Sequence, residues 1–578
     1  MRAIALLVAA LAGAGPAGTP ELGDLKVPAE RLCAWRPGVD GGVPDTSGWP
    51  VLDATRFGAR ANDLVDDTKE INAAIGQAAR KAEAAAAGRG AVVFLPAGVY
   101  RFSHGTSVRM MSGVVLRGAG AGKTVLAGDR GRLLYVRFGD SVARGGWGSW
   151  GAVHFAGGAG RAVNVTSARL PRGTATVELA DAAGLRKGDF VFLRQIANDP
   201  AVIQHDDRRP TMTHVARVAA LAGRTVTLDR PLRHAFQPSL GVRLRPMAPI
   251  RNAGIEHLKV MNDEESPDKH IGLVAFSGAV CCWARGVHFY NGHHYHATFQ
   301  FSARNTVEAC RFQRLLYAER QAEPDNRRDN YAVGVGVGAA DNLVTDNAFV
   351  NLFVSVVFER GAGGNVFSYN YLTGRRGGAG ILFHGRYPHA NLVEGNDATA
   401  VTLDNTHGRQ GPRNTAFRNR LRGTGRFRTE DDTSLKPPTI ADRLNVIANT
   451  ARAFCGVGSG SYDDGAAGDF DRRMANLWAE RNVVRDTRPP AGRRRWGLVE
   501  RTPQPTSRFV DNHVGAAAPA AWRKLRMPAS LYLTGPPSFW PKGKPWPALG
   551  ADVDDFAAGK LTKLPAQHRQ ETQRGPSR

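Results

Sequence analysis

Cysteine and long apolar segments are both scarce in this sequence. The 578 residues include 5 Cys and no Cys-x-x-Cys pair, which argues against a disulfide scaffold or a zinc ribbon. Cys281, Cys282 and Cys310 lie in apolar contexts and are expected in the core. Cys33 and Cys455 could pair if the protein is exported. After the first fifteen or so residues no apolar run is long enough to span a bilayer, which excludes a multi-pass membrane protein.

Acidic residues are also in deficit. The chain has 52 Asp+Glu against 76 Lys+Arg, a formal net charge of +24. Such a balance favours a polyanionic partner, namely nucleic acid, an anionic cell surface or an acidic polysaccharide. An Arg-rich composition inherited from a GC-rich genome would give the same excess. Nucleic acid is the least favoured partner, because the sequence has no helix-turn-helix and no aromatic residues interleaved with basic ones.

The first residues have the features of a secretory signal. Arg2 is followed by an apolar stretch and then by small residues. We therefore expect a signal peptide over residues 1–19 and a secreted or periplasmic location. A wrongly assigned start or a single membrane anchor is the alternative.

The most informative feature is a repeat in which two Asn residues, five positions apart, enclose a short apolar segment. Its copies are residues 342–347 (NLVTDN), 365–370 (NVFSYN), 391–396 (NLVEGN) and 414–419 (NTAFRN), whose first Asn residues are 23, 26 and 23 positions apart. A period near 23 with Asn and Gly turns indicates a solenoid. The Leu-x-x-Leu-x-Leu frame of leucine-rich repeats is absent. The pattern therefore predicts an all-β fold, a right-handed parallel β-helix in which turn asparagines stack between coils.

A different block precedes the repeats. Residues 57–75 (FGARANDLVDDTKEINAAI), 92–102 (VVFLPAGVYRF) and 114–120 (VVLRGAG) resemble the N-terminal signature of the pectate-lyase-like superfamily of secreted bacterial β-helix proteins. Leu64 departs from that signature, which usually has Gly there. The resemblance implies a helix, opened by Asp66, Asp67 and Thr68, that caps one end of the solenoid.

The remaining segments complete the expected organisation. Short strand-like runs such as residues 176–179, 189–193 and 225–228 predict a small antiparallel β insert. We expect an N-terminal extension at 20–48, the cap and first coils at 49–160, the insert at 161–245, the main β-helix at 246–525, and a C-terminal segment with a basic tail at 526–578.

Aligning the repeats on their first Asn brings basic side chains into register. His384 and His407 both precede that Asn by seven positions, and Arg360, Arg386 and Arg409 precede it by five. Equivalent positions on successive coils lie ~4.8 Å apart. Stacked cations repel each other unless an anionic ligand lies across them. The alternative is a solvated ladder, or arginines paired with Glu359, Glu394 or Asp404.

A second cluster contains His293, His294, Tyr295 and His296. Neighbours on a strand point to opposite faces, so the four side chains cannot converge on one metal ion. We expect His294, His296 and Tyr331 to line the same groove as the arginines, with a structural role as the alternative. No metal site is predicted, and a calcium requirement is left open.

Three functions compete. In a polysaccharide lyase acting by β-elimination at a uronate, His407 would be the base or acid, His384 its partner, and Arg386 and Arg409 the carboxylate neutralisers. In a glycoside hydrolase, two carboxyl groups among Glu359, Glu394 and Asp404 would flank the bond. The third hypothesis is a glycan-binding or surface protein without catalytic activity. The first is preferred, with an acidic polysaccharide as the partner, no nucleic acid, and a monomer as the expected state.

Overall fold

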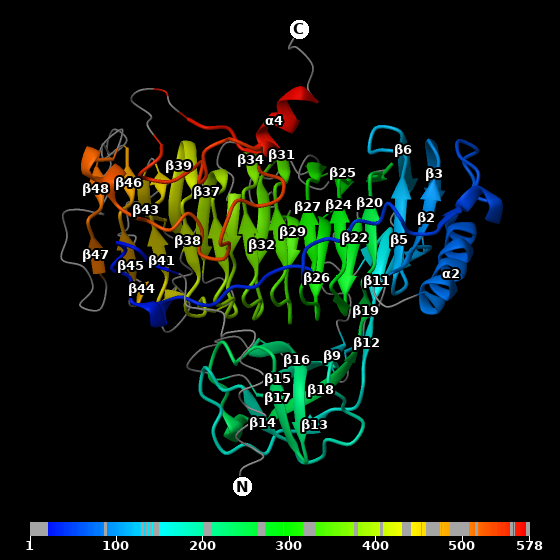
Figure 1. Cartoon of the computed structure of the whole chain (residues 1–578), viewed down its shortest axis with the longest axis horizontal. Coiled ribbons are helices and arrows are strands. Elements are labelled where there is room, and N and C mark those ends of the chain that lie inside the picture. Colours follow the sequence, from blue (N-terminus) through cyan, green and yellow to red (C-terminus); the bar gives the residue numbers. More distant parts are fainter. Residues whose placement is uncertain are drawn as a thin grey trace.

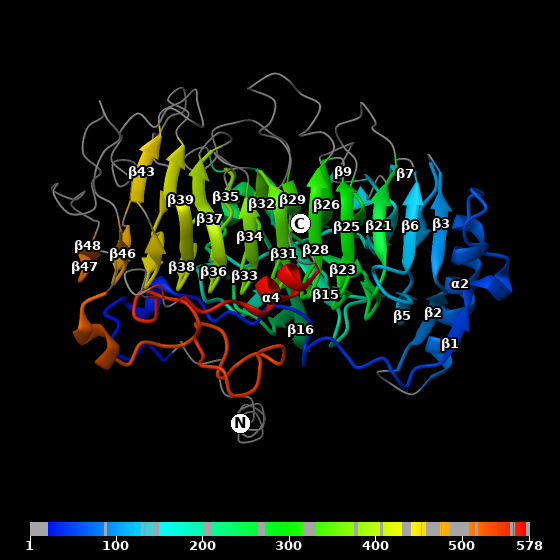
Figure 2. The same cartoon turned by 90° about the horizontal axis from the view of Figure 1, so that it is seen from above.

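A computed structural model gives the architecture of the chain (Figures 1 and 2). It describes residues 21–85, 89–103, 105–128, 150–197, 211–263, 272–292, 294–315, 331–374, 380–404, 408–430, 441–451, 477–485, 508–514, 518–554 and 561–573, with short pieces between these ranges. His293, His407 and the expected signal peptide lie outside the described residues, and the side chain of Cys455 is not described.

The body of the molecule is a solenoid of short parallel strands. Its first sheet contains β1 (Val51–Asp53), β2 (Ala91–Leu95), β5 (Val114–Gly118), β20 (Gly254–Glu256), β24 (Trp283–Arg285), β27 (Thr306–Glu308), β30 (Leu343–Thr345), β33 (Val366–Ser368), β36 (Leu392–Glu394), β38 (Thr415–Phe417), β41 (Asn445–Ile447), β45 (Trp478–Glu480) and β47 (Arg508–Val510). Every neighbouring pair in this sheet is parallel, with one strand supplied by each coil.

The other strands of each coil form two further layers, visible from above in Figure 2. The second layer contains β3 (Gly98–Phe102), β6 (Thr124–Gly128), β21 (Lys259–Asn262), β25 (His288–Gly292), β28 (Arg311–Leu315), β31 (Ala348–Leu352), β34 (Tyr371–Gly374), β42 (Thr450–Ala451), β46 (Val483–Val484) and β48 (His513–Val514). The third contains β4 (Val108–Arg109), β11 (Val153–Ala156), β22 (Val274–Ser277), β26 (Tyr295–Gln300), β29 (Tyr331–Val335), β32 (Val354–Phe358), β35 (Gly380–Phe383) and β43 (Ala453–Val457). The longer β37 (Asp397–Asp404) and β39 (Arg420–Glu430) pair with strands of both layers.

Inward side chains of successive coils stack into apolar columns. Phe289, Phe312 and Phe349 stack at ring-centroid distances of 4.6 Å for each neighbouring pair. Because strand side chains alternate, the residues between these inward positions point to the outer surface.

The repeated asparagines form two buried ladders. In each, the side-chain amide of one Asn donates to the side-chain oxygen of the Asn on the next coil, at 2.8–3.1 Å. The first ladder contains Asn305, Asn342, Asn365, Asn391 and Asn414, and the second contains Asn347, Asn370, Asn396, Asn419, Asn449, Asn482 and Asn512. The predicted stacking of turn asparagines is therefore present.

The solenoid is capped at its N-terminal end by α2 (Thr68–Ala84), seen at one end of Figure 1. Its buried face, which includes Ile71, Ile75 and Ala78, joins the solenoid core. The Asp66 carboxylate accepts from the Thr68 amide at the start of the helix. The predicted fold, a right-handed parallel β-helix with an N-terminal capping helix and an antiparallel insert, is confirmed.

The insert projects from one side of the solenoid (Figure 1). Its antiparallel strands are β12 (Gly158–Ala159), β13 (Val163–Asn164), β14 (Thr176–Glu178), β15 (Phe190–Gln195), β16 (Thr213–Ala222), β17 (Thr225–Leu228) and β18 (Val242–Ala248). Short two-stranded pairings join β7 (Arg132–Leu133) to β10 (Trp150–Gly151), β8 (Arg137–Phe138) to β9 (Ser141–Val142), β19 (Ile250–Arg251) to β23 (Ala279–Val280) and β40 (Ala441–Asp442) to β44 (Met474–Ala475). Short 3-10 turns are η1 (Ala29–Arg31), η2 (Ala54–Phe57), η3 (Pro238–Leu240) and η5 (Ala520–Lys524).

Both ends of the described chain lie along the first sheet (Figures 1 and 2). The N-terminal segment binds it through Trp35, whose indole N–H donates to the Ala390 carbonyl at 2.6 Å. The C-terminal segment binds it through the Leu531 amide and ends in α4 (Pro565–Thr572), which packs on β31. Within the described part of the chain, no helix combines the length and apolarity needed to cross a bilayer.

Candidate active site

A polar column crosses the outer face of the third layer where β32, β35 and β37 end. The parallel register pairs Phe358 with Phe383 and Phe383 with Leu403, and all three rings or branches point into the core. The next residues on the three coils therefore point outward in one row: Glu359, His384 and Asp404.

His384 and Asp404 form the closest charged contact of this column. Nδ1 of His384 lies 2.7 Å from Oδ2 of Asp404, and the other Asp404 carboxylate oxygen accepts from the Gly385 amide at 3.2 Å. Burial by itself would lower the pKa of His384, but the charge and hydrogen bond of Asp404, with a further contribution from Glu359, raise it to about 9. His384 is consequently an imidazolium at neutral pH.

Arg360 lies near this ion pair, next to Glu359 in the sequence, and its charge opposes protonation of His384. Nη1 of Arg360 lies 3.3 Å from Oε1 of Glu359, and both side chains are nearly buried. The Gly361 amide donates to the Arg386 carbonyl, and the Tyr387 amide donates to the Arg409 carbonyl. These bonds place Arg360, Arg386 and Arg409 on three successive coils. The backbone therefore brings these three positions near one another, and the stacking of their side chains stays a prediction.

The neighbour that the structure gives His384 is Asp404, which the alignment on the Asn ladder does not predict. Aligning on the Asn ladder places His384 opposite His407, but the β35–β37 register places it opposite Asp404. The offset between the coils is 20 residues at this strand and 23 at the ladder, where Leu392 pairs with Thr415. His407 lies outside the described residues. The proximity of the two histidines therefore stays a prediction, although the offset between these coils is not constant along them.

The insert borders this site. Gly361 directly follows Arg360 and has a positive φ of 74°, and a Cβ there would lie 1.9 Å from the Thr211 carbonyl oxygen. A glycine is therefore required for this close approach. The Thr213 hydroxyl also lies 3.5 Å from the Gly361 carbonyl oxygen. The start of β16 thus forms a wall beside the arginine column.

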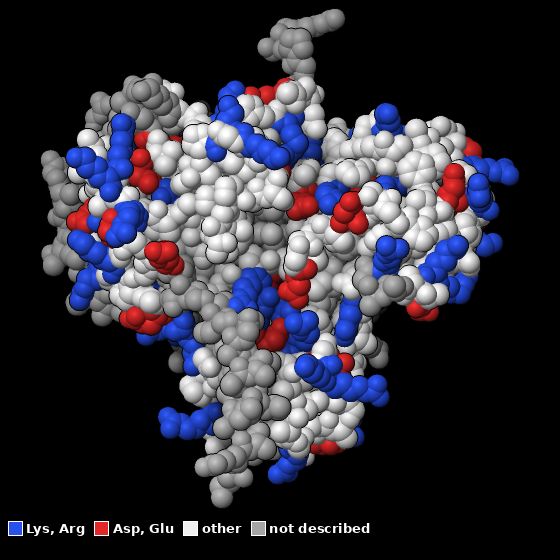
Figure 3. Space-filling model, viewed as in Figure 1, with Lys and Arg blue, Asp and Glu red and all other residues white. Residues whose placement is uncertain are grey.

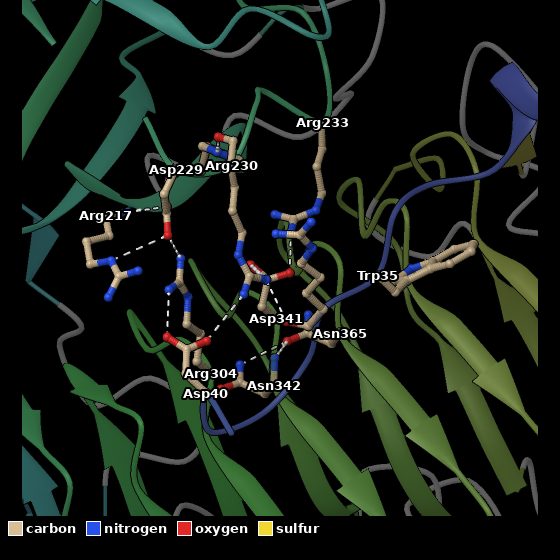
Figure 4. Close-up of polar contacts among 12 residues, drawn as sticks. Trp35, Asp40, Arg217, Asp229, Arg230, Arg233, Arg304, Asp341, Asn342 and Asn365 are labelled. Atoms are coloured by element: carbon tan, nitrogen blue, oxygen red, sulfur yellow. Dashed lines mark hydrogen bonds and ion pairs between the residues drawn. The ribbon is translucent and has the colours of Figure 1, made fainter. Parts of the chain in front are cut away.

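A buried ion-pair network holds the insert against the solenoid (Figure 4). Asp341, on a solenoid turn, binds Arg233 and accepts from Arg230 at 2.9 Å. Arg304 of the solenoid binds Asp229 of the insert at 2.5 Å and Asp40 of the N-terminal segment at 3.2 Å. Burial would raise the pKa of Asp341, but Arg230 and Arg233 lower it below its usual value. Figure 3 shows basic and acidic side chains gathered at this junction.

The other aromatic and histidine candidates lie away from the ion pair. Tyr331 is near the start of its strand, and its register partner Val354 lies five positions before Glu359, about 16 Å along an extended strand. His294 is fully buried against the Tyr295 and Tyr331 rings. These side chains therefore do not join the His384–Asp404 pair.

His296 belongs to the core. Its ring packs near Phe289 and Phe312, and its Nε2 lies 2.9 Å from the Arg314 carbonyl oxygen. Burial lowers the pKa of His296 to about 3, so the ring is neutral. This geometry matches the structural alternative considered for the histidine cluster.

Glu394 lies on the first sheet under the C-terminal segment, a different face of the solenoid. Its Oε2 accepts from the Leu531 amide at 2.9 Å, and the Tyr369 hydroxyl lies 3.3 Å from its Oε1. Burial raises the pKa of Glu394 to about 7. The two carboxylates that share a face with His384 are therefore Glu359 and Asp404.

In the described part of the chain, no three His, Cys, Asp or Glu side chains are grouped so that they could hold a metal ion. The conspicuous ligands of the site are instead guanidinium groups and one imidazolium. These groups suit an anionic substrate, because Arg binds carboxylate through two parallel hydrogen bonds.

Comparison with known proteins gives one family match. Residues 51–166 match the family described as "Rhamnogalacturonase A/epimerase, pectate lyase-like". No curated protein matches the sequence.

Several solved structures are similar at low sequence identity. The tailspike gp61 of Pseudomonas phage phi297 is 12% identical over 75% of this chain and 74% of that chain, with a TM-score of 0.40. A tailspike mutant of E. coli bacteriophage HK620, solved in complex with a pentasaccharide, is 13% identical over 88% and 72%, with a TM-score of 0.40. The A-module of the Azotobacter vinelandii mannuronan C-5 epimerase AlgE6 is 12% identical over 80% and 93%, with a TM-score of 0.34.

Proposed function

From the premise that this chain is a pectate-lyase-like parallel β-helix protein, we propose that it is an exported enzyme that cleaves an acidic polysaccharide by β-elimination at a uronate. The observation that carries the proposal is the His384–Asp404 ion pair, which lies beside the Glu359–Arg360 pair of the preceding coil, with the backbones of Arg386 and Arg409 at matching positions of the coils that follow. This cluster supplies both an acid and carboxylate neutralisers.

β-Elimination needs three functions around the sugar. A base removes the proton from the carbon next to the carboxylate, the bond to the leaving oxygen breaks, and an acid protonates that oxygen. Arg386 and Arg409 would bind the substrate carboxylate and stabilise the negative charge that develops on it. Arg360 and Glu359 would hold the neighbouring sugar.

His384 would be the acid. Asp404 occupies its Nδ1, so a proton delivered to the leaving oxygen must come from Nε2. A pKa of about 9 keeps His384 protonated at neutral pH, which makes it unsuited to act as the base. We assign the base to His407, which follows Asp404 by three positions in the sequence.

Hydrolysis is the second candidate, because two carboxylates share this face. Glu359 and Asp404 lie one coil on either side of His384, so their backbones are about 9.6 Å apart. Inverting glycosidases hold their carboxyl groups at roughly 6.5–9.5 Å. Both carboxylates, however, already bind a cation, Arg360 or His384, which disfavours a neutral acid at either position.

The test is an ultraviolet assay for the unsaturated uronate product on a panel of acidic polysaccharides, with and without chelator. We expect absorbance with the wild-type protein, a loss of at least about a hundredfold in His384→Ala and His407→Ala, and normal activity in His568→Gln, an exposed residue of α4. Loss with chelator would contradict the metal-free mechanism. New reducing ends without absorbance would favour hydrolysis. Binding without either product would favour a non-catalytic glycan-binding protein.

A further inference from the structure

A second cavity lies on the first-sheet side of the solenoid, between the two ends of the chain. Its volume is about 910 Å³, which falls within the range of small-ligand sites. The charged and aromatic residues of its lining include Glu21, Trp35, Arg36, Arg526, Tyr532 and Trp546. We call this cavity the terminal groove.

The terminal groove is held in shape by contacts between distant parts of the sequence. The Asp24 amide donates to the Arg526 carbonyl at 3.0 Å, and the Arg526 amide donates to the Asp24 carboxylate at 2.6 Å. Gly23 allows this approach, because it has a φ of 53° and a Cβ there would lie 1.7 Å from the Arg526 carbonyl oxygen. The two chain segments are therefore built to lie together.

The walls are also tied to the solenoid and the insert. Trp35 is fixed by its bond to the Ala390 carbonyl, and the Tyr532 hydroxyl lies 2.7 Å from the Ser368 hydroxyl. The carbonyl of Arg36 accepts from Arg230 of the insert at 2.6 Å, while the Arg36 side chain is exposed. A ligand would thus meet the anchored rings of Trp35 and Tyr532 and the exposed side chains of Arg36 and Arg526.

The chemistry of these walls fits a carbohydrate that carries carboxylates. Tyr532 and Trp546, which are both partly exposed, offer apolar ring surface on which the C–H faces of sugars pack, and the nearly buried Trp35 contributes to the wall. Arg36 and Arg526 offer guanidinium groups that pair with carboxylate. The single lining carboxylate among the six, Glu21, is exposed at the rim.

We propose that the terminal groove is a second, non-catalytic binding site for acidic oligosaccharide. It lies over the first sheet, whereas His384 lies on the outer face of the third layer, so one polymer could be held at one face while another segment is processed at the other. The ligand class rests on the proposed function as well as on the groove, and the experiment separates the two.

The experiment is calorimetric titration of the full chain carrying His384→Gln, which prevents turnover from consuming the ligand. The probes are tetrasaccharides of galacturonate, mannuronate and glucuronate, and the methyl-esterified form of the one that binds. We expect Arg36→Ala with Arg526→Ala to weaken binding by at least about tenfold, since charge-assisted hydrogen bonds are lost. The exposed Lys524→Ala is the matched control in the same segment.

Glu21→Gln gives an independent readout, since removing a carboxylate from the rim should tighten binding of an anionic ligand several-fold without removing any contact of the fold. Unchanged affinity in both groove variants, an equal loss in Lys524→Ala, or equal binding of the esterified probe would overturn the proposal. If wild-type protein shows no turnover but Arg36-dependent binding persists, the proposed function fails and the groove stands. If turnover depends on His384 but the groove variants bind normally, the groove proposal fails and the proposed function stands.

Discussion

At the scale of single residues, the site depends on one buried imidazolium. His384 would be neutral and easily accommodated on its own, because burial disfavours its charged form. Asp404 reverses this preference through a charge-assisted hydrogen bond of 2.7 Å. Arg360 adds positive charge nearby, so the ion pair keeps a proton in surroundings that would otherwise expel it.

This argument gives a prediction for Asp404→Asn. The folded-state pKa of His384 is about 9 against 6.5 for the free side chain, a difference equivalent to roughly 3 kcal/mol. Because the pKa is raised on folding, this stabilisation is complete below pH 6.5 and disappears as the pH rises through 9. We expect Asp404→Asn to lower the free energy of unfolding by about that amount at pH 6 and by much less at pH 10. Urea unfolding at the two pH values measures it.

The same substitution should change the pH profile of turnover. If His384 is the acid, wild-type kcat/KM falls as the pH rises through about 9, and in Asp404→Asn the fall begins at lower pH. A stability loss with an unshifted pH profile would mean that the pair is purely structural.

The partners of single side chains are also what the sequence predicts least well. Glu359, His384, Asp404 and the three arginines were identifiable from their positions relative to the repeated Asn. The pairing of His384 with Asp404 was not, because the offset between these two coils is 20 residues at the strand and 23 at the Asn ladder. Glu394 fits the same repeat, yet only the path of the distant C-terminal segment shows that it is covered.

At the scale of elements, the Asn ladders explain why the coils keep their register. Asn370 is fully buried and makes four side-chain bonds: it donates to the Val344 carbonyl and to Asn396, and accepts from the amide and side chain of Asn347. A shift of one coil by one residue would break all of these bonds. The fold could therefore be predicted from the repeat, because every copy of the pattern forms the same turn on a successive coil.

Asn370→Asp tests the ladder with almost no change in size. The substitution removes the donors to Val344 and Asn396 and buries a carboxylate against their oxygens, so we expect a loss of at least about 3 kcal/mol in unfolding free energy. Asn351→Asp is the matched control, because Asn351 is an exposed asparagine of β31 outside the ladders. Equal losses in the two variants by urea unfolding would contradict a special role for the ladder.

Glu394 gives a second prediction at this scale, for the docking of the C-terminal segment. Its pKa is raised by burial from 4.5 to about 7, so the folded chain binds more protons than the unfolded chain between these values. The segment should consequently be held less tightly as the pH rises from 4.5 to 7. We expect Glu394→Gln to raise the unfolding temperature at pH 8 and leave it nearly unchanged at pH 4. A loss of stability at both pH values would show that the carboxylate itself is needed.

At the scale of the whole molecule, the solenoid is a platform to which three separate parts of the chain are bound by polar contacts. The insert is held by Asp341, the N-terminal segment by Trp35, and the C-terminal segment by Leu531 and by Arg418, which binds Asp552 at 2.6 Å. The repeat pattern contains no information on these contacts, since they join residues more than a hundred positions apart. They decide which faces of the solenoid are open to a ligand.

The strongest test of this arrangement is Asp341→Ala. Asp341 is 1% exposed and neutralises Arg230 and Arg233, so its removal takes the buried carboxylate away from both guanidinium groups and leaves Arg230, among the described carboxylates, only the half-exposed Asp40 at 3.8 Å. Breaking a buried pair in this way costs about 3–5 kcal/mol. We expect the insert to separate from the solenoid before global unfolding, seen as a new low-temperature calorimetric transition and as proteolytic cleavage within residues 161–245. Because β16 borders the arginine column, turnover should fall together with that separation. Arg217→Ala is the matched control: it removes a half-exposed partner of Asp229 at 3.6 Å and should change stability by less than about 1 kcal/mol. A single transition at an unchanged temperature in Asp341→Ala would mean that apolar contacts alone hold the insert in place.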